Sequence, residues 1–343
     1  MRPRVGFLGL GWIGRHRLQA LAGADLVDVI ALCDPYAASL DGAARCAPHA
    51  RHVETLEALL DEKLDAVVIA TPSALHAAQA IRCFEHGVAV FCQKPLARSS
   101  DEAAAVIRAA CSADRLLGVD MCYRHTAAVR AIKQLIQDES LGSIYAADLV
   151  FHNAYGPGKD WYYASALAGG GCFMDLGIHL VDQVLWLLGW STVRVVDTRL
   201  FHQGERWCRE AGRVEDFAHI VLEGPRGAVA RLACSWRAPA GCDARIGTEL
   251  FGTAGGARVS NVNGSFYDFA AERRDGTSAT TLASPPDEWG GRAIVNWARD
   301  LARGGTYHAS AAHHVTLAGI VDQVYAHAER DTRESSLPAY IVG

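Results

Sequence analysis

Positive charge is not in excess in this sequence. Its 33 Lys and Arg residues are outnumbered by 38 Asp and Glu, and the formal net charge is -5 at pH 7. A nucleic-acid partner requires a cationic face for the phosphate backbone, so we expect none. Long hydrophobic runs are also lacking, because Gly, Asp, His or Pro interrupts each apolar stretch before the roughly 20 residues of a membrane helix. We therefore expect no membrane partner.

Paired cysteines and a leader sequence are lacking too. None of the ten cysteines forms a C-x-x-C pair, which argues against zinc and against a redox dithiol. The N-terminus has no long apolar core followed by a small-residue cleavage site, as a signal peptide would have. His313 and His314 are adjacent and would point in different directions on a helix, so we interpret them as structural. These features predict a cytoplasmic protein with no bound metal.

The 343 residues are enough for about two domains. Residues 1–121 alternate short apolar runs with amphipathic stretches, the pattern of βα units in a parallel sheet. We therefore predict a Rossmann dinucleotide-binding domain over residues 1–121. Its strands are expected at residues 5–9, 27–33, 66–70, 88–91 and 116–120, and its helices at residues 13–22, 74–85 and 101–110.

Residues 122–343 have a different pattern. Turn sequences such as Gly224-Pro225-Arg226-Gly227 and Asp275-Gly276 are typical of antiparallel strand pairs. We predict an α+β domain with a large, mostly antiparallel open sheet. One face should be covered by helices, and the other should be apolar enough to pair with another subunit. Strands are expected at residues 144–151, 194–201, 217–222, 229–236, 248–251 and 266–271, and helices at 127–137, 175–188, 292–302 and 312–328.

A glycine-rich turn lies between the first strand and the first helix. The run Gly9-Leu10-Gly11-Trp12-Ile13-Gly14 is G-x-G-x-x-G, and the acidic Asp34 follows about 20 residues later at the end of the second strand. This pattern predicts a dinucleotide site made by Gly9, Gly11, Trp12, Ile13, Gly14 and Asp34; the alternative is three turn glycines without a ligand. Asp34 would bind the ribose hydroxyls and repel a 2′-phosphate, which favours NAD over NADP unless Arg15 or Arg17 approaches.

Two further turns follow strands at the same edge of the predicted sheet. Thr71-Pro72-Ser73 follows the strand at 66–70, with His76 one turn later, and either contacts the cofactor or starts a helix with Ser73 as its N-cap. Gln93-Lys94-Pro95 follows the strand at 88–91, which places Gln93 and Lys94 beside the expected nicotinamide.

Polar residues form one stripe on an otherwise apolar helix of the second domain. Asp175, His179 and Asp182 are spaced at i, i+4 and i+7. A structural histidine is one interpretation of His179. Because an aspartate one turn away can orient the imidazole and stabilise its cation, acid–base catalysis is the interpretation we favour.

These motifs, together with Tyr123-Arg124, resemble the Gfo/Idh/MocA family of dehydrogenases in order and spacing. The resemblance implies hydride transfer between a nicotinamide and a secondary alcohol or ketone of a sugar, cyclitol or sugar derivative, with Lys94, Asp175 and His179 as catalytic residues. The family usually has Glu-Lys-Pro where this chain has Gln93-Lys94-Pro95, so a negative charge is missing beside Lys94. Members of the family often associate through the large sheet, which implies a homodimer or homotetramer.

In the expected mechanism, His179 takes the hydroxyl proton and Lys94 hydrogen-bonds the same oxygen, but the sequence leaves open which of the two is the immediate proton partner. Substrate contacts are expected from Lys94, Tyr123, Arg124, Lys159, Trp161, Asp175 and His179. Two alternatives use the same motifs: a hydrolase or epimerase that retains NAD, and a non-catalytic dinucleotide-binding regulator.

Overall fold

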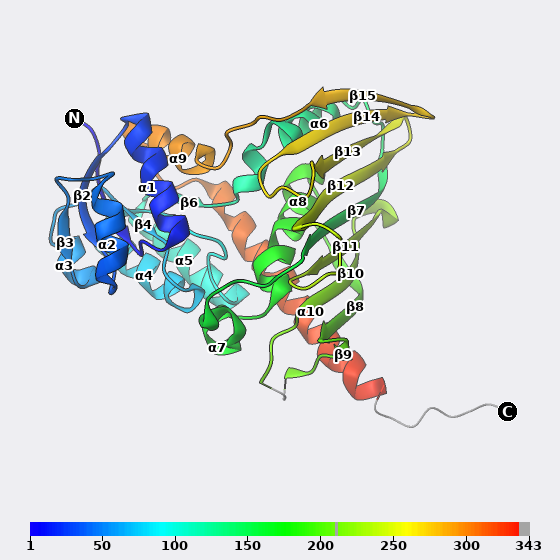
Figure 1. The fold of residues 1–343 in the computed structure, drawn as a ribbon, viewed down its shortest axis with the longest axis horizontal. Coiled ribbons are helices and arrows are strands. Elements are labelled where there is room, and N and C mark those ends of the chain that lie inside the picture. The colour runs from blue at the N-terminus through cyan, green and yellow to red at the C-terminus, as the bar shows by residue number, and fades with distance from the viewer. Residues whose placement is uncertain (210–211, 336–343) are drawn as a thin grey trace. The chain divides into compact units, whose positions relative to one another are not determined.

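The computed structural model describes residues 1–209 and 212–335, and the chain forms two compact units (Figure 1). The first unit comprises residues 1–122 and 289–318, and the second comprises residues 123–288 and the chain from residue 319 onward. The sequence-based division assigned all of residues 122–343 to one domain. The observed units differ from it because the chain returns to the first unit at Trp289, where the helix that follows packs on the first sheet.

The sheet of the first unit is parallel throughout, with strand order β3-β2-β1-β4-β5-β6. This is the Rossmann order, so the predicted fold class is confirmed. The strands are β1 (Arg4–Leu8), β2 (Asp28–Cys33), β3 (Arg51–Val53), β4 (Ala66–Ile69), β5 (Ala89–Cys92) and β6 (Leu117–Val119). The helices are α1 (Trp12–Ala24), α2 (Ala37–Ala44), α3 (Leu56–Leu60), α4 (Ser73–Glu85), α5 (Ser100–Ala113) and α9 (Arg292–Ala302).

Both faces of this sheet are buried under helices, as its apolar strands require. On one face α1 and α9 cover the sheet, and the Trp297 ring of α9 lies 5.4 Å from the Phe91 ring of β5. On the other face α4 and α5 contribute Phe84 and Val106 to a second core. Ser99 accepts a hydrogen bond from the Glu102 N–H and so caps α5.

The second unit is built on a nine-stranded sheet of order β15-β14-β13-β12-β7-β11-β10-β8-β9. Among the described strands of this second sheet, only β7 and β11 form a parallel pair. The strands are β7 (Ile144–Asn153), β8 (Arg194–His202), β9 (Glu205–Arg206), β10 (Phe217–Glu223), β11 (Val229–Ser235), β12 (Ala244–Gly252), β13 (Gly255–Asn261), β14 (Phe269–Asp275) and β15 (Ser278–Ala283). The two predicted turns join β10 to β11 and β14 to β15, which confirms both antiparallel pairs.

Helices cover one face of this sheet (Figure 1). They include α6 (Ala127–Gln137), the short α7 (Ser165–Ala168), the π-helical turn η3 (Phe173–Gly177) and α8 (Ile178–Leu188); α10 (His313–Ser335) is shared between the two units. Although Gly, Asp and His interrupt it, the stretch Ser165–Leu188 has the length and composition of a membrane span, with a mean hydropathy of 1.3 over 18 residues. Because 83% of this stretch is buried inside the protein, it is the core helix of the second unit.

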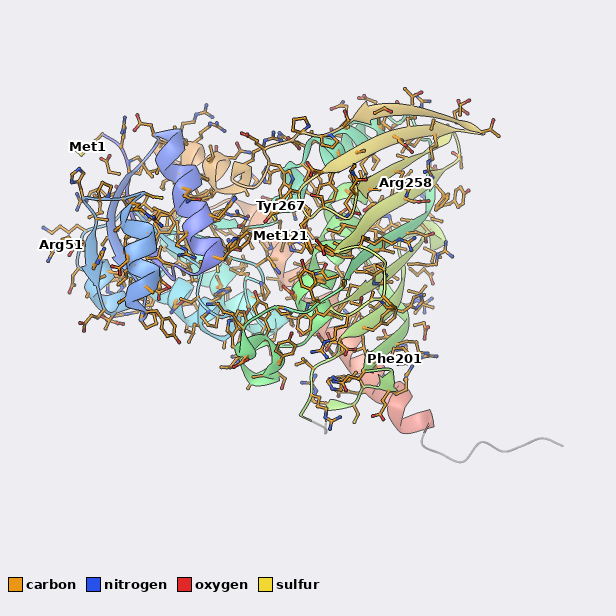
Figure 2. The ribbon with its side chains drawn as sticks, viewed as in Figure 1. Met1, Arg51, Met121, Phe201, Arg258 and Tyr267 are labelled. Atoms are coloured by element: carbon orange, nitrogen blue, oxygen red, sulfur yellow. The ribbon has the colours of Figure 1, made fainter. Side chains whose placement is uncertain are left out.

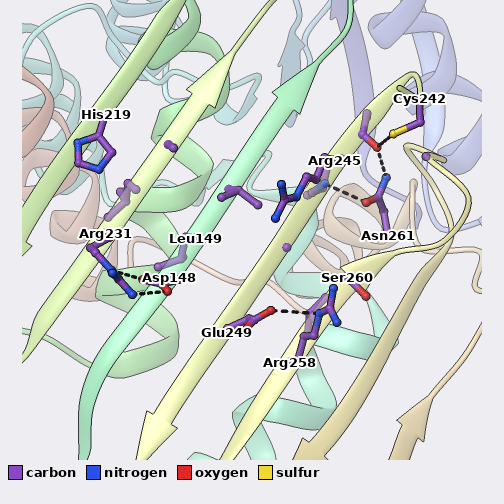
Figure 3. A pocket seen from close by; sticks show the side chains of 18 residues that line it. Asp148, Leu149, His219, Arg231, Cys242, Arg245, Glu249, Arg258, Ser260 and Asn261 are labelled. Atoms are coloured by element: carbon purple, nitrogen blue, oxygen red, sulfur yellow. Dashed lines mark hydrogen bonds and ion pairs between the residues drawn. The ribbon is translucent and has the colours of Figure 1, made fainter. Parts of the chain in front are cut away.

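The opposite face of the sheet mixes charged residues with apolar ones such as Val150 and Val221, and its pairing with another subunit stays a prediction. Along the strands, buried residues such as Leu149 alternate with charged ones, because successive side chains of a strand point to opposite faces. Arg231 donates two 2.5 Å hydrogen bonds to Asp148, and Arg258 pairs with Glu249 at 3.3 Å (Figure 3). These pairs line a cavity of about 600 Å³ on this face. Figure 2 shows the side chains of both units, with Arg258 on β13.

Candidate active site

Five candidate functional segments lie at the same edge of the first sheet, each directly after a strand. Because the strands are parallel, their carboxyl ends share one edge, where ligands of such sheets bind. Gly9 follows β1, Asp34 follows β2, Thr71 follows β4, Lys94 follows β5 and Asp120 follows β6. The structure therefore brings the predicted residues of this unit to one edge.

The glycine turn can hold a dinucleotide. Gly9 has φ +91°, and a Cβ atom there would lie 2.6 Å from the backbone carbonyl of Ala70, so no other residue fits. A Cβ atom at Gly14 would lie 2.2 Å from the Gly9 oxygen. No side chain caps the N-terminus of α1, which begins at the exposed Trp12 followed by Ile13, with Gly11 as N-cap. A narrow turn opening onto free helical amides is suited to the pyrophosphate of NAD(P).

Asp34 is fixed beside this turn. Its carboxylate accepts hydrogen bonds from the Leu10 N–H at 2.6 Å and the Tyr36 N–H at 2.9 Å, and the residue is buried. The acid thus lies next to the glycine turn, where the pattern predicted a ribose ligand.

The two arginines considered as binders of a 2′-phosphate have different environments. Arg17 is buried, and its Nε donates a 2.5 Å hydrogen bond to Asp120. Arg15 lies against Gly42 of α2 and lines a hollow of about 230 Å³ together with Trp12 and Arg45. Arg17 is therefore committed elsewhere, and only Arg15 is left near the start of α1.

The Thr71 turn is joined to the Lys94 turn by His76. The two ring nitrogens of His76 contact the Thr71 and Pro95 carbonyl oxygens, both at 2.7 Å, and the residue is only 1% exposed. Burial lowers the pKa of His76, whereas the two carbonyl acceptors raise it. Both ring nitrogens of His76 therefore contact the protein itself. His76 holds the Thr71 and Lys94 turns in place and would affect a bound cofactor only through the position of these turns.

Of the two alternatives for the Thr71 turn, the one that starts a helix with Ser73 as N-cap is wrong about the cap. Helix α4 already includes Ser73, its N-cap is Pro72, and no side chain caps it. The Thr71 hydroxyl instead donates a 2.6 Å hydrogen bond to the side-chain oxygen of Gln79, which lies within α4. The turn is held by these contacts, so Ser73 is not needed as a cap.

Sequence analysis did not assign a function to Asp120. The Gln93 amide donates a hydrogen bond to the Asp120 carboxylate, which also accepts from Arg17, and Asp120 is 1% exposed. The negative charge that Gln93 lacks is therefore present on Asp120, 27 residues later in the chain. No local pattern could have revealed this pair, because only the parallel pairing of β5 with β6 brings the two residues together.

In the second unit, Asp175 lies within the π-helical turn η3 at the start of the buried helix. Such turns are rare and often occur at functional sites. The indole Nε1 of Trp236 donates a 3.0 Å hydrogen bond to the Asp175 carboxylate. Trp236 is only 1% exposed. The sequence predicted it only as the last residue of the strand at 229–236, so its contact with Asp175 was missed.

His179 lies one turn further along the same helix. It is 5% exposed, and the Tyr123 ring meets the imidazole edge-on at a centroid distance of 4.8 Å. Asp182 completes the stripe and accepts a 2.7 Å hydrogen bond from Arg124 Nε. Arg124 therefore lies beside the stripe through its pairing with Asp182, and Tyr123 lies beside His179.

The loop that precedes the glycine run contributes aromatic residues. Trp161 stacks on Tyr162 with ring centroids 3.8 Å apart, whereas Lys159 is exposed. Burial, and secondly the charge of Asp175, raises the pKa of Tyr162. Tyr162 is thus a second residue near Asp175 that we did not single out from the sequence, although it lies in the loop from which substrate contacts were expected.

A buried acid holds the start of this helix. Glu215 accepts hydrogen bonds from the N–H groups of Gly171 and Phe173 and from the Tyr325 hydroxyl, all at 2.9–3.1 Å. A Cβ atom at Gly171 would lie 1.9 Å from the Glu215 carbonyl oxygen. Burial raises the pKa of Glu215 to about 7 against the opposing effect of these hydrogen bonds. The glycine run is therefore needed for close packing of η3 on Glu215.

Known proteins resemble this chain in sequence and in fold. Inositol 2-dehydrogenase from Rhizobium meliloti is 29% identical over 264 residues, which is 76% of each chain. A 3-ketoreductase from Actinomadura kijaniata, solved with NADP and TDP-benzene, superposes with a TM-score of 0.82 at 21% identity and covers 95% of this chain and 98% of its own. Levoglucosan dehydrogenase, solved with NADH and levoglucosan, has a TM-score of 0.82 at 22% identity, with 96% and 98% covered.

Two family descriptions match successive parts of the chain. Residues 3–121 match the oxidoreductase family with an NAD-binding Rossmann fold, and residues 129–258 match the GFO/IDH/MocA C-terminal domain. Together they cover more than half of the sequence and agree with the two sheets described above. The chain belongs to the GFO/IDH/MocA family of oxidoreductases.

Proposed function

We propose that this oxidoreductase transfers a hydride between NAD and a secondary alcohol or ketone of a sugar, a cyclitol or a sugar derivative. The observation that carries this proposal is the sheet edge of the first unit, where the glycine turn follows β1 and Lys94 follows β5, two parallel strands with only β4 between them. The relatives named above act on an inositol, on a keto group and on an anhydrosugar, which supports the substrate class.

The preference for NAD over NADP rests on Asp34. Its carboxylate is held beside the glycine turn by two backbone N–H groups, so it would accept hydrogen bonds from ribose hydroxyls and repel a 2′-phosphate. Gly9, Gly11 and Gly14 would hold the pyrophosphate, and Thr71 and Lys94 lie along the same edge. When bound, the nicotinamide supplies the hydride acceptor or donor.

The proposed proton chemistry uses His179 and Lys94. His179 accepts the proton of the substrate hydroxyl, and Lys94 donates a hydrogen bond to the same oxygen and stabilises its developing negative charge. Asp175, anchored by Trp236, lies one helical turn before His179 and would orient its imidazole. In the direction of ketone reduction the same groups act in reverse.

Substrate hydroxyls would be bound by the side chains around these residues. Tyr123 lies beside His179, Tyr162 lies near Asp175, and Trp161 stacks on Tyr162. Aromatic faces with polar tips suit a polyhydroxylated ring. Arg124 and the exposed Lys159 complete the proposed set.

The test is a panel of hexoses, inositols and nucleotide-linked sugars, each offered with NAD and with NADP, with absorbance of the reduced cofactor as the readout. The proposal expects accumulation of free NADH with at least one member of the panel. Turnover of substrate without net NADH would instead favour an enzyme that retains NAD. Binding of NAD without turnover of any compound would favour a regulator.

We further propose that the protein is a cytoplasmic homodimer or homotetramer that associates through the charged face of the nine-stranded sheet. Its ten cysteines are all free, which suits a reducing compartment. One cross-strand row contains Arg231, Asp148, Glu249 and Arg258 in successive strands. A row with two carboxylates in the middle and an arginine at each end can pair with the same row of a second copy across a two-fold axis.

A further inference from the structure

A buried polar network joins the cofactor turn to the turn that carries Lys94, within the first unit. Arg17 of α1 donates to Asp120 Oδ2 at 2.5 Å, and Gln93 donates to the same oxygen. Arg17 also contacts the His16 ring at 2.8 Å. Since α1 begins at the glycine turn and Gln93 precedes Lys94, the network connects both parts of the sheet edge.

This buried network is a poor source of folding stability, so stability alone does not explain it. Arg17 and Asp120 are 3% and 1% exposed, and a buried ion pair is often no more stabilising than apolar residues of the same volume. In addition, Asp120 Oδ1 is buried and has no hydrogen-bond partner among the described residues. A buried oxygen without a hydrogen-bond partner lowers the stability of the folded state. A cost of this kind suggests a functional role for the Asp120 charge.

The group that this charge would serve is Lys94. Asp120 follows β6 and Lys94 follows β5, and these two strands are paired. Gln93, which precedes Lys94 in the chain, donates a hydrogen bond to Asp120. Cys122 feels the charges of Asp120, Arg17 and Lys94 together, and His76 feels that of Lys94. Asp120 and Lys94 are therefore both close to Cys122, and Arg17 is the cation that the structure pairs with Asp120.

We propose that Asp120 is a positioning residue for Lys94, and that the site requires one carboxylate and one amide shared between positions 93 and 120. Asparagine and aspartate have the same shape, as do glutamine and glutamate. The pair can therefore be exchanged: glutamate at 93 with asparagine at 120 keeps one hydrogen bond and one negative charge beside Lys94. This inference rests on the proposed function of Lys94.

The experiment measures the apparent pKa of the Lys94 amine by competitive acylation over a pH series, followed by mass spectrometry of the Lys94 peptide. It uses the full chain and the variants Asp120→Asn, Gln93→Glu and Gln93→Glu/Asp120→Asn. An acidic neighbour raises the pKa of a lysine, by about one unit or more at this range. Asp120→Asn should lower the value by about one unit, Gln93→Glu should raise it by about one unit, and the double variant should return it to the wild-type value.

Far-UV circular dichroism and the thermal unfolding midpoint check that each variant is folded, because neither depends on cofactor binding. The control is Asp61→Asn, an exposed acid of the same unit that should leave the Lys94 value unchanged. Should Asp120→Asn alone fail to fold, the comparison of Gln93→Glu with the double variant decides the question.

The proposal is overturned if both single variants leave the Lys94 pKa unchanged, or if adding Asp120→Asn to Gln93→Glu does not reverse its effect. Acylation does not require turnover. A protein that oxidises none of the offered sugars would therefore contradict the proposed function while leaving this result readable.

Discussion

Trp236 is the side chain through which the second unit fixes the carboxylate of Asp175. The Asp175 carboxylate is half-buried, and the indole N–H donates to it at 3.0 Å from the residue that follows β11. The residue also packs edge-on against Tyr163 at 5.4 Å. Its role is therefore both to hold the acid and to fill the core.

Replacement Trp236→Phe separates these two roles, because phenylalanine keeps an aromatic ring and removes the donor. We expect kcat to fall about tenfold, the effect of one hydrogen bond to a charged group, with a smaller change in KM. Steady-state kinetics with the substrate found in the panel measure this split. Trp190→Phe, a buried tryptophan of the same unit, is the control and should leave kcat near that of the wild type.

Asp34 sets the expected choice between the two nicotinamide cofactors. Replacement Asp34→Ser removes the negative charge but leaves a small hydrogen-bonding group. We expect kcat/KM with NAD to fall by about tenfold or more, and that with NADP to rise, because the repulsion of a 2′-phosphate is lost. Kinetics with both cofactors measure the ratio. A wild-type protein that already prefers NADP would contradict this account of Asp34, and Arg15→Ala would then show whether Arg15 is the responsible cation.

At the scale of elements, Glu215 links the stability of η3 to pH. Its folded pKa of about 7 lies above the ordinary glutamate value of 4.5, so the folded state binds the proton more tightly than the unfolded state. This contribution to stability is complete below about pH 4.5 and is lost as pH rises through about 7. The free energy of unfolding should decrease by about 3 kcal/mol over that range, in addition to the effects of other groups.

The measurement is urea unfolding of the wild type and of Glu215→Gln at several pH values. Glutamine cannot ionise, so the difference between the two proteins should change with pH and level off above about pH 8. A difference that stays constant across the series would show that Glu215 does not titrate between the two states.

Much of the element order is readable from the sequence because the strands of the first sheet are apolar on both faces. The predicted helices at 127–137 and 292–302 have the observed bounds of α6 and α9. The strands that were missed are polar or glycine-rich: β3 carries Arg51 and His52, β13 starts with Gly255-Gly256, and β15 is exposed along most of its length. Their pairing partners, and not their own composition, make them strands.

The site was less predictable than the elements. Local patterns predict part of the site, so these residues could be identified directly from the sequence: the glycine turn, Asp34, Lys94, and the stripe formed by Asp175 and His179. Asp120, Trp236 and Glu215 act on residues 27 to 61 positions away in the chain, through sheet pairing and core packing. Contacts of this kind have no sequence signature. The packing of α9 on the first sheet was missed for the same reason.

For the whole molecule, association through the charged sheet face predicts sensitivity to salt. Exposed ion pairs are screened by salt, so light scattering at micromolar concentration should show a dimer or tetramer at low ionic strength and a shift toward smaller species as salt is added. The charge reversal Arg231→Glu places an acid beside Asp148 and should weaken association further. A protein that is monomeric at low salt would contradict the proposed assembly.

The proposed enzyme combines proton chemistry from both units with hydride transfer to the nicotinamide. His179→Asn and Lys94→Met each remove one partner of the reacting oxygen, and each should lower kcat by about 100-fold or more while NAD still binds. Exchange of the exposed Lys159 to Met is the matched control for charge, since it is expected to affect KM more than kcat.

The most direct test is isotope transfer from a substrate of the panel that carries deuterium on the carbon to be oxidised. The account predicts that mass spectrometry finds the deuterium in the reduced nicotinamide produced by the wild-type protein, with formation of labelled NADH strongly reduced in His179→Asn and Lys94→Met. Unlabelled NADH, or full transfer in both variants, would contradict it.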